Sequence, residues 1–227
     1  MARTQIGFLL FPRLTQLDMT GPFEVFARLP DTDVHLAWKT TDPVTSDVGL
    51  RILPTTDLAG CPPLDVLCVP GGPGVNALLD DGEVLAFLAR QGAAARFVTS
   101  VCSGALVLGA AGLLKGYRAA THWAAMEFLA PFGATAEDVR VCVDRNRITG
   151  GGVTAGIDFG LRVAAALAGE TVARTIQLYM EYDPEPPFRS GSPKTAPAEV
   201  VDGFRAFAAP MIAERAAAVA RAAARLG

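Results

Sequence analysis

The chain has 227 residues, of which 51% are hydrophobic and 19% charged, and its formal net charge is −3. A chain of this length and hydrophobic content can bury a full core, so residues 1–227 are expected to form one domain. It has no block of Lys and Arg, so it lacks the positive surface expected of a nucleic-acid-binding protein. No stretch reaches the roughly 18 apolar residues that a membrane-spanning helix needs, and the apolar run before Pro12 is too short for a secretory signal, so a cytoplasmic location is expected.

Short apolar runs rich in β-branched and aromatic residues alternate with longer segments of helical periodicity. The continuous apolar runs IGFLLF and LDVLCV are typical of strands that helices cover on both faces of a parallel sheet. The alternation predicts an α/β sandwich with a mostly parallel sheet and helices on both faces. In chain order, the predicted strands span residues 5–11, 34–40, 64–69, 96–100, 139–143 and 146–149, and the predicted helices span residues 22–29, 83–91, 103–111, 122–132, 155–167 and 171–181.

Proline and glycine mark the segments between these elements. Gly21-Pro22 is typical of a helix that begins with proline in its first turn. Residues 41–54 are predicted to form a small excursion or hairpin, and the proline-rich residues 182–197 to form an extended connector. Residues 198–226 are rich in alanine and predict a last helix, which we expect to dock on the domain or on a second copy and to carry no chemistry.

The four cysteines are expected to be free thiols in a reducing compartment. They form no C-x-x-C pair and the chain has only two histidines, so no zinc site is predicted. Cys68 and Cys142 lie inside apolar strands, where cysteine acts as a small buried hydrophobic residue. Cys102 differs from them because of what surrounds it.

In the segment V-C-S-G, residues 101–104, a predicted buried strand runs directly into a helix of small residues. Cys102 lies at the turn between the two. A nucleophile on such a turn projects from the carboxyl end of a sheet, where ligand sites of α/β proteins form. Small neighbours, Ser103 and Gly104, allow the close approach of helix and strand. Amides at the helix N-terminus are expected to lower the pKa of the thiol. The alternative is a packed structural cysteine.

A second glycine-rich turn, VPGGPG at residues 69–74, follows the preceding strand. It is neither a Walker loop nor a GxGxxG fingerprint. Glycines after a strand let backbone amides approach a ligand, so the Gly72 amide is a candidate oxyanion donor beside Cys102. The alternative is that these glycines only form the turn.

The combination of PGGPG, SVCSGALVLGAAGLL and ATHW resembles the ThiJ/PfpI group of the class I glutamine amidotransferase-like superfamily. Within this group, FLLFPRLTQLDMTGPFEVF, CSGALVLGAAGLLKG and ITGGGVTAGIDFGL are similar to the corresponding segments of isonitrile (isocyanide) hydratases. The resemblance implies a flavodoxin-like fold, a homodimer, and a cysteine nucleophile at the strand-to-helix turn around Cys102, which we call the elbow. The implied catalysis needs neither a metal nor an organic cofactor.

The resemblance also implies the residues of the site. Asp18 would be the acidic partner of Cys102, whereas Glu24 is expected to be an exposed helix charge. Ser103 stands where related hydratases often have threonine. Serine retains the hydroxyl, so a donor near the substrate is kept, and the Ser103 amide is a second oxyanion candidate. Gly152 and Val153 would lie near the nucleophile as pocket or helix-packing positions rather than as chemical groups. His122 is expected to begin a helix, with an accessory role beside Cys102 as the alternative.

The implied reaction is the addition of water to an isonitrile, with Cys102 as nucleophile and Asp18 as general acid and base. Besides a non-catalytic redox sensor that oxidises Cys102 to sulfinate, two other function classes stay open. The first is a ligand-sensing domain related to AraC-type transcription regulators, although some 30 residues after the connector are too few for a pair of helix-turn-helix units. The second is a glyoxalase-like or deglycating enzyme, which would use a glutamate partner or a Cys–His pair.

Overall fold

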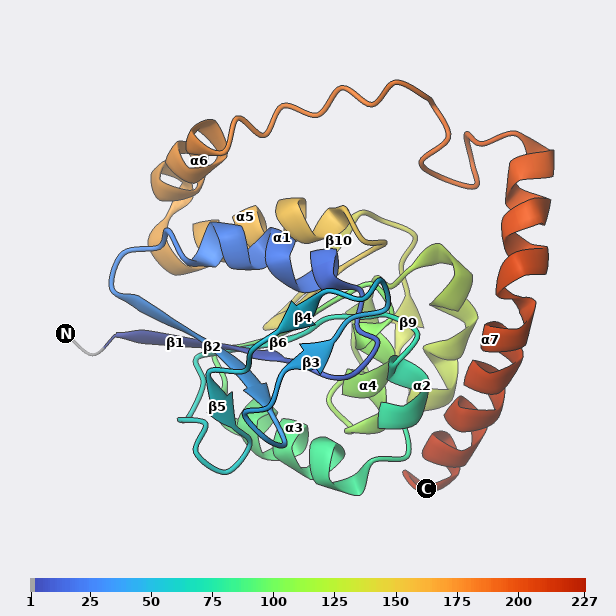
Figure 1. Cartoon of the computed structure of the whole chain (residues 1–227), viewed down its shortest axis with the longest axis horizontal. Coiled ribbons are helices and arrows are strands. Elements are labelled where there is room, and N and C mark those ends of the chain that lie inside the picture. Colours follow the sequence, from blue (N-terminus) through green and yellow to red (C-terminus); the bar gives the residue numbers. More distant parts are fainter. Residues whose placement is uncertain (1–2) are drawn as a thin grey trace.

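The computed structural model describes residues 3–227, and a seven-stranded sheet lies at its centre (Figure 1). The strand order is β10-β11-β7-β6-β1-β2-β5, and every neighbouring pair is parallel except β10 and β11. The strands are β1 (Thr4–Leu9), β2 (Thr32–Trp38), β5 (Thr56–Asp57), β6 (Val66–Val69), β7 (Phe97–Val101), β10 (Val141–Asp144) and β11 (Arg147–Gly150).

The register of the central strands brings their carboxyl ends to one edge of the sheet. Val69 in β6 pairs with Ser100 in β7, and Ser100 pairs with Thr149 in β11. The turns after β6, β7 and β11 therefore lie side by side. This edge is where open parallel sheets place their ligand sites.

Helices cover both faces of the sheet, as the strand–helix alternation predicts (Figure 1). One layer contains α1 (Gln16–Phe26) and α5 (Ala155–Ala168), with α6 (Glu170–Tyr179) packed against α5. The other layer contains α2 (Val75–Leu78), α3 (Gly82–Ala94) and α4 (Gly104–Ala110). The core fills the space between sheet and helices, and the rings of Phe8, Phe26 and Phe159, in tilted and edge-to-face contacts, join β1 to α1 and α5.

Two predicted helices differ from the observed ones. Helix α1 begins at Gln16, so Pro22 lies inside the helix rather than in its first turn. Pro22 has no N–H to donate to the Asp18 carbonyl, and its ring packs against α5 where Gly156 leaves space: a Cβ on Gly156 would lie 3.2 Å from Pro22 Cδ. The single helix predicted over residues 122–132 is instead a pair of 3₁₀ helices, η1 (Trp123–Phe128) and η2 (Ala130–Phe132).

Two small sheets complete the body. β3 (Val44–Thr45) and β4 (Arg51–Ile52) form an antiparallel pair, which confirms the hairpin predicted within residues 41–54. β8 (Arg118–Ala119) and β9 (Thr135–Ala136) form a parallel pair that the sequence analysis did not predict.

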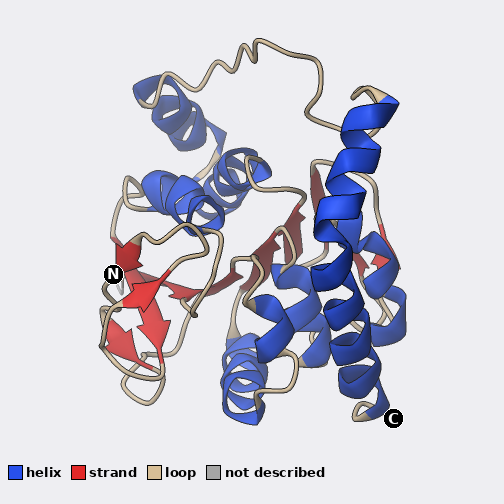
Figure 2. Cartoon of the chain, turned by 45° about the vertical axis from the view of Figure 1, so that its right-hand side comes forward, coloured by secondary structure: helices blue, strands red, loops and turns tan. Residues whose placement is uncertain are grey.

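The C-terminal arm consists of the connector, residues 182–197, and α7 (Ala198–Ala224). The connector is largely exposed and arches over the molecule from α6 to α7 (Figures 1 and 2). Helix α7 contacts α2, α4, η1 and η2. Among the helices of residues 3–227, none has the length and apolar character required to cross a membrane.

Candidate active site

Cys102 lies on a strained turn between β7 and α4. Its φ angle is 56°, a left-handed conformation that non-glycine residues seldom adopt. Its N–H donates to the carbonyls of Gly150 at 3.1 Å and Gly151 at 2.8 Å, and its own carbonyl accepts the Thr121 hydroxyl at 2.8 Å. The surrounding backbone thus fixes the elbow predicted from V-C-S-G. The side chain is buried, with 7% of the residue exposed.

Small residues make the close approach around this elbow possible. A Cβ on Gly104 would lie 2.1 Å from the Val69 carbonyl, so α4 can begin here only with glycine at that position. A Cβ on Gly71 would lie 2.5 Å from Ser103 N and 2.9 Å from Asp18 Oδ2. Gly71 is therefore the point where the glycine turn, α1 and α4 meet.

Asp18 lies in the first turn of α1 and is fully buried, with 0% of the residue exposed. Its Oδ2 accepts the Gly71 N–H at 2.8 Å, and the start of α1 is tied to the same turn by a bond from Thr15 N–H to the Gly71 carbonyl at 2.9 Å. Within the described residues, Asp18 Oδ1 has no hydrogen-bond partner of ordinary geometry. A buried carboxyl oxygen without a partner is expensive in free energy, which is the usual mark of a functional group.

Asp18 and Cys102 titrate as a pair. Burial raises the pKa of Asp18 to about 7, against the opposing effects of the Gly71 N–H and of an interaction with Cys102. Burial and the negative charge of ionised Asp18 raise the pKa of Cys102 well above that of an ordinary thiol. Two adjacent buried groups cannot both carry a negative charge cheaply, so between about pH 7 and the raised pKa of Cys102 the pair holds one shared proton.

The pKa of Cys102 corrects one expectation. The Ser103 N–H at the start of α4 does lower the pKa of the thiol, as expected of a helix N-terminus, but burial outweighs it. The helix alone therefore does not generate the thiolate. A thiolate at this position requires that Asp18 hold the proton.

Ser103 and Gly72 contact each other, which corrects the expected role of Gly72. The Gly72 N–H donates to Ser103 Oγ at 3.1 Å, and Ser103 Oγ lies 3.4 Å from the Gly72 carbonyl. The Gly72 amide is thus occupied by a side chain and is not free as an oxyanion donor. Gly72 has a φ of 131°, and a Cβ there would lie 2.5 Å from Thr15 N, so its glycine serves the turn. The Ser103 amide, by contrast, faces the sulfur of Cys102.

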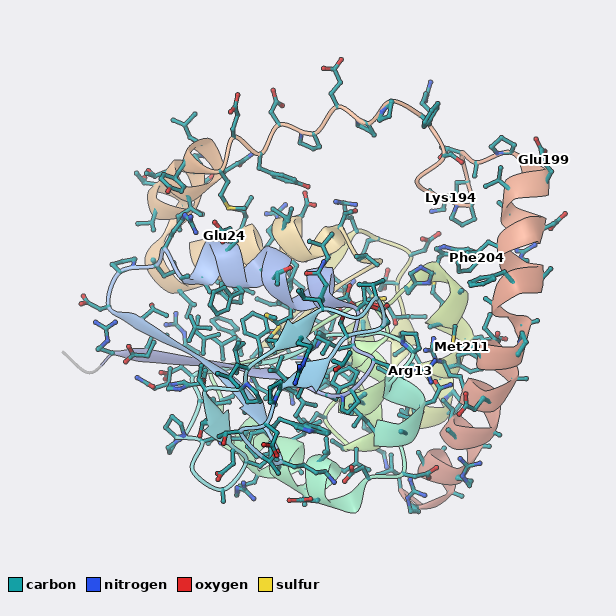
Figure 3. All side chains as sticks on the ribbon, in the orientation of Figure 1. Arg13, Glu24, Lys194, Glu199, Phe204 and Met211 are labelled. Carbon is teal, nitrogen blue, oxygen red and sulfur yellow. The ribbon has the colours of Figure 1, made fainter. Side chains whose placement is uncertain are left out.

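His122 begins the helix η1, as expected, and does not act on Cys102 in this arrangement. Its Nδ1 accepts the Ala124 N–H at 3.2 Å. Burial and the nearby Arg215 lower the pKa of His122, which keeps the ring neutral. The ring packs against Trp123 and Phe204, at centroid distances of 5.6 and 6.1 Å, and these two rings also contact each other at 5.1 Å; Phe204 reaches inward from α7 (Figure 3).

A pocket of about 550 Å³ lies next to Gly151, whose carbonyl accepts the Cys102 N–H, but Cys102 and Asp18 are not among the residues that line it. Thr121, His122, Gly152 and Val153 line its inner side, which includes both pocket positions expected from the sequence. Residues 191–194 of the connector line the other side, so the arm forms part of the wall. Glu24 points away from the site and pairs with Arg28 at 2.6 Å, which fits its expected role as a surface charge (Figure 3).

Arg215 is the charged residue that sequence analysis missed. It lies on α7 with 4% exposed, and its charge acts on both Cys102 and His122. The sequence carries no signal for it, because an alanine-rich helix does not indicate which of its arginines turns inward. Over residues 3–227, no group of three His, Cys, Asp or Glu side chains is arranged to hold a metal ion.

Comparisons with known proteins place the chain among relatives of the same architecture. It is 56% identical to the isonitrile hydratase of Pseudomonas putida over 222 residues, 98% of this chain and 97% of that protein. Its structure matches a THiJ/PfpI family protein from Pseudomonas syringae with a TM-score of 0.94 and 49% identity, over 96% of this chain and 91% of that one.

A more distant relative is the HTH-type transcriptional regulator GbdR of Pseudomonas aeruginosa. The two are 29% identical over 187 residues, which cover 78% of this chain but 50% of the regulator. The DJ-1/PfpI family model matches residues 4–166, which include β1 to most of α5 and therefore the whole elbow. The chain belongs to the DJ-1/PfpI family.

Proposed function

We propose that this protein is an isonitrile hydratase, an enzyme that adds water to R–N≡C and releases the N-substituted formamide R–NH–CHO. The observation that carries the proposal is the buried pair of Cys102 and Asp18, in which a carboxyl with a pKa of about 7 adjoins a thiol on a strained elbow. The similarity to the P. putida isonitrile hydratase over nearly the full length of both chains supports the same activity.

The first step uses the shared proton of the pair. With the proton on Asp18, Cys102 is a thiolate and attacks the terminal carbon of the isonitrile. Asp18 donates its proton to that carbon, so that a covalent thioimidate, R–N=CH–S–Cys102, forms and Asp18 becomes a carboxylate. The unpartnered Oδ1 leaves Asp18 free to deliver the proton.

The second half consumes water. The Asp18 carboxylate takes a proton from the attacking water, whose oxygen bonds to the thioimidate carbon, and the same proton passes to nitrogen. Asp18 then removes the hydroxyl proton as the carbonyl forms and the Cys102 thiolate leaves. The formamide is released, and the pair regains its thiolate and its single proton.

The neighbouring groups have supporting roles. The Ser103 amide faces the sulfur and stabilises the thiolate each time it forms, while the Ser103 hydroxyl is held by the glycine turn. Gly152 and Val153 line the pocket that receives the R group. Gly152 is required to be small because a Cβ there would lie 3.1 Å from His122 Cδ2.

A substrate panel with detection of the intermediate tests the function. The purified protein should convert cyclohexyl or p-nitrophenyl isonitrile to the formamide and leave methylglyoxal unchanged. Acid quenching during turnover should give a Cys102 peptide heavier by the mass of the isonitrile. Conversion of methylglyoxal instead would favour the glyoxalase class, and tight ligand binding without any turnover would favour a sensor.

We also propose that the protein is a cytoplasmic homodimer whose chain forms one folding unit. The described cysteines are all free thiols, which fits a reducing compartment. Large apolar side chains of the arm and of α6, Leu178, Phe188 and Phe207, are exposed in the single chain, which supports burial against a second copy. Light scattering should give twice the mass of one chain, and thermal unfolding should show one transition.

A further inference from the structure

Side-chain hydrogen bonds and ion pairs attach helix α7 to the segment that follows the glycine turn. Arg221 and Arg225 both pair with Asp80, at 2.7 and 2.9 Å. Asn76 in α2 donates to the Met211 carbonyl and to Glu214 Oε2, each at 3.2 Å. These bonds fix the rotation of α7 about its axis, so they determine which of its side chains faces the elbow.

Arg215 is the charged side chain that faces inward. Its Nε donates to Asn76 Oδ1 at 2.9 Å, and its Nη2 lies 3.4 Å from the Gly72 carbonyl. The same glycine donates its N–H to Ser103 Oγ. The guanidinium is therefore joined by one residue to the start of α4, where Cys102 lies.

Arg215 makes no direct ion pair with a carboxylate, although the charge of Glu214 acts on it. None of the ion pairs within 4.0 Å in residues 3–227 includes Arg215, and its two acceptors are an amide and a carbonyl oxygen. A guanidinium stays protonated in proteins, and a buried cation without a counter-charge is costly. A protein retains such a cation where an anion forms close by during function.

The charged groups around Arg215 indicate which anion this is. Glu214 lies next to it on α7 but is held by Asn76, and His122 on η1 is neutral. Asp18 reaches the elbow from the α1 side and Asp47 acts on Asp18. The Arg215 charge favours the ionised form of Cys102. Burial lowers the pKa of Arg215, and the charges of Cys102 and Glu214 oppose that effect.

We propose that Arg215 is a positioning residue for the reaction: its guanidinium, delivered by α7, is the counter-charge that draws the shared proton from Cys102 to Asp18 and holds the sulfur as a thiolate. The inference rests on the proposed function of Cys102 as nucleophile. It assigns to the C-terminal helix an electrostatic part in the site, so that the site is complete only while α7 is docked.

The thiolate can be titrated directly by its ultraviolet absorbance, with each variant corrected by the same variant carrying Cys102→Ser. Arg215→Met removes the charge and keeps an unbranched chain; because it also removes an unpaired buried cation, we expect it to fold. The thiolate midpoint should rise by about one pH unit, which lowers the thiolate fraction near neutral pH about tenfold and kcat/KM with it.

Three further variants sharpen the test. Arg215→Lys keeps the charge and should retain most of the thiolate, whereas a purely structural role of the fork-shaped guanidinium would not be rescued. Arg205→Gln removes a charge from the exposed side of the same helix and should leave the midpoint unchanged. Arg215→Gln, which can still bond to Asn76, is the second neutral variant in case Arg215→Met does not fold.

The result that overturns the inference is a folded neutral variant whose thiolate titration coincides with that of the wild type. This outcome is independent of the proposed function, because the titration needs no substrate. A wild-type protein that gives no formamide, but whose thiolate midpoint rises in Arg215→Met, would reject the isonitrile hydratase proposal and retain the electrostatic role of Arg215.

Discussion

The elbow and the C-terminal arm both contribute to the surroundings of Cys102, but they are built differently. At the elbow, β7, α1 and the glycine turn are joined by backbone hydrogen bonds and by glycine contacts that leave no room for a Cβ at Gly71 or Gly104. The arm is joined to the body by side chains, among them the pairs of Asp80 with Arg221 and Arg225.

The difference shows how the two regions divide the work of the site. The elbow must hold the Cys102 sulfur and the Asp18 carboxyl within reach of the same substrate carbon, so its backbone has to be rigid. A charge that acts through space tolerates small displacements, so a docked helix can supply it. Because exposed ion pairs are weak, α7 is expected to leave its place far more easily than α1.

Replacement of the nucleophile should have the largest effect. Cys102→Ala should reduce formamide formation by about 10⁴-fold or more, because no other group can form the thioimidate. Product formation from an isonitrile, followed by chromatography, measures the loss. Cys61→Ala, at a half-buried thiol outside the site, is the matched control and should keep full activity. An active Cys102→Ala protein would remove the elbow from the mechanism altogether.

Asp18→Asn should reduce turnover by about 10²- to 10⁴-fold, because the proton shuttle is lost while the bond to the Gly71 N–H can be kept. The same variant should be more stable than the wild type above pH 7. The folded pKa of Asp18, about 7, is above its unfolded value, so its contribution to stability is full below about pH 4 and is lost as the pH rises to 7.

Chemical denaturation at pH 8 measures this gain, which should be about 2–4 kcal/mol and should vanish near pH 4. Asp47→Asn, which changes a carboxyl that acts on Asp18 from outside the elbow, should give little gain. Equal stability of Asp18→Asn and wild type at pH 8 would contradict the raised pKa of Asp18.

The pH profile of the wild type should report the shared proton. Below about pH 7 both groups of the pair are protonated and Cys102 is a thiol, so kcat/KM should rise as the pH rises through 7. It should fall again only where the pair loses its last proton, well above the range of an ordinary thiol. A profile that falls between pH 6 and 8 would mean that Asp18 and Cys102 titrate independently.

Gly71→Ala tests the rigid side of the comparison with a single methyl group. The new Cβ would meet Ser103 N at 2.5 Å, so the turn or α4 must shift. We expect a loss of about 1–3 kcal/mol in stability, and about 100-fold in kcat because Asp18 and Cys102 move apart. Gly82→Ala is the control, since a Cβ at Gly82 meets no atom within 4 Å. Unchanged activity of a folded Gly71→Ala protein would show that the elbow is more adaptable than its geometry implies.

Asp80→Ala should give the smallest effect, about 1 kcal/mol in stability, because it removes two half-exposed ion pairs. Proteolysis within residues 182–197 should become several-fold faster while turnover falls only a few-fold, since Asn76 still holds α7. Asp202→Ala breaks an ion pair on the solvent side of α7 and should leave both unchanged. A loss of activity as large as that of Gly71→Ala would mean that the arm is as essential to the geometry as the elbow.

Local sequence determined most of the architecture and the position of the nucleophile. The apolar runs around Phe8 and Cys68 predict buried parallel strands because two covering layers leave no polar alternation. The elbow at Cys102 could be predicted because a strand that runs directly into a helix of small residues places one residue at the turn between them. The pairing of Asp18 with Cys102 came from the resemblance to a family, since no local pattern links residues so far apart.

Only the tertiary structure decided which groups face one another. Helix α1 begins at Gln16, which places Pro22 in its interior against Gly156 of α5, and the Gly72 amide bonds to Ser103 rather than being left for a substrate. The buried arginine of α7 depends on how the helix is rotated, which Asn76 and Asp80 fix from a distant part of the chain. Periodicity records which residues share a face, but burial, pKa and docking depend on contacts between segments that the sequence keeps far apart.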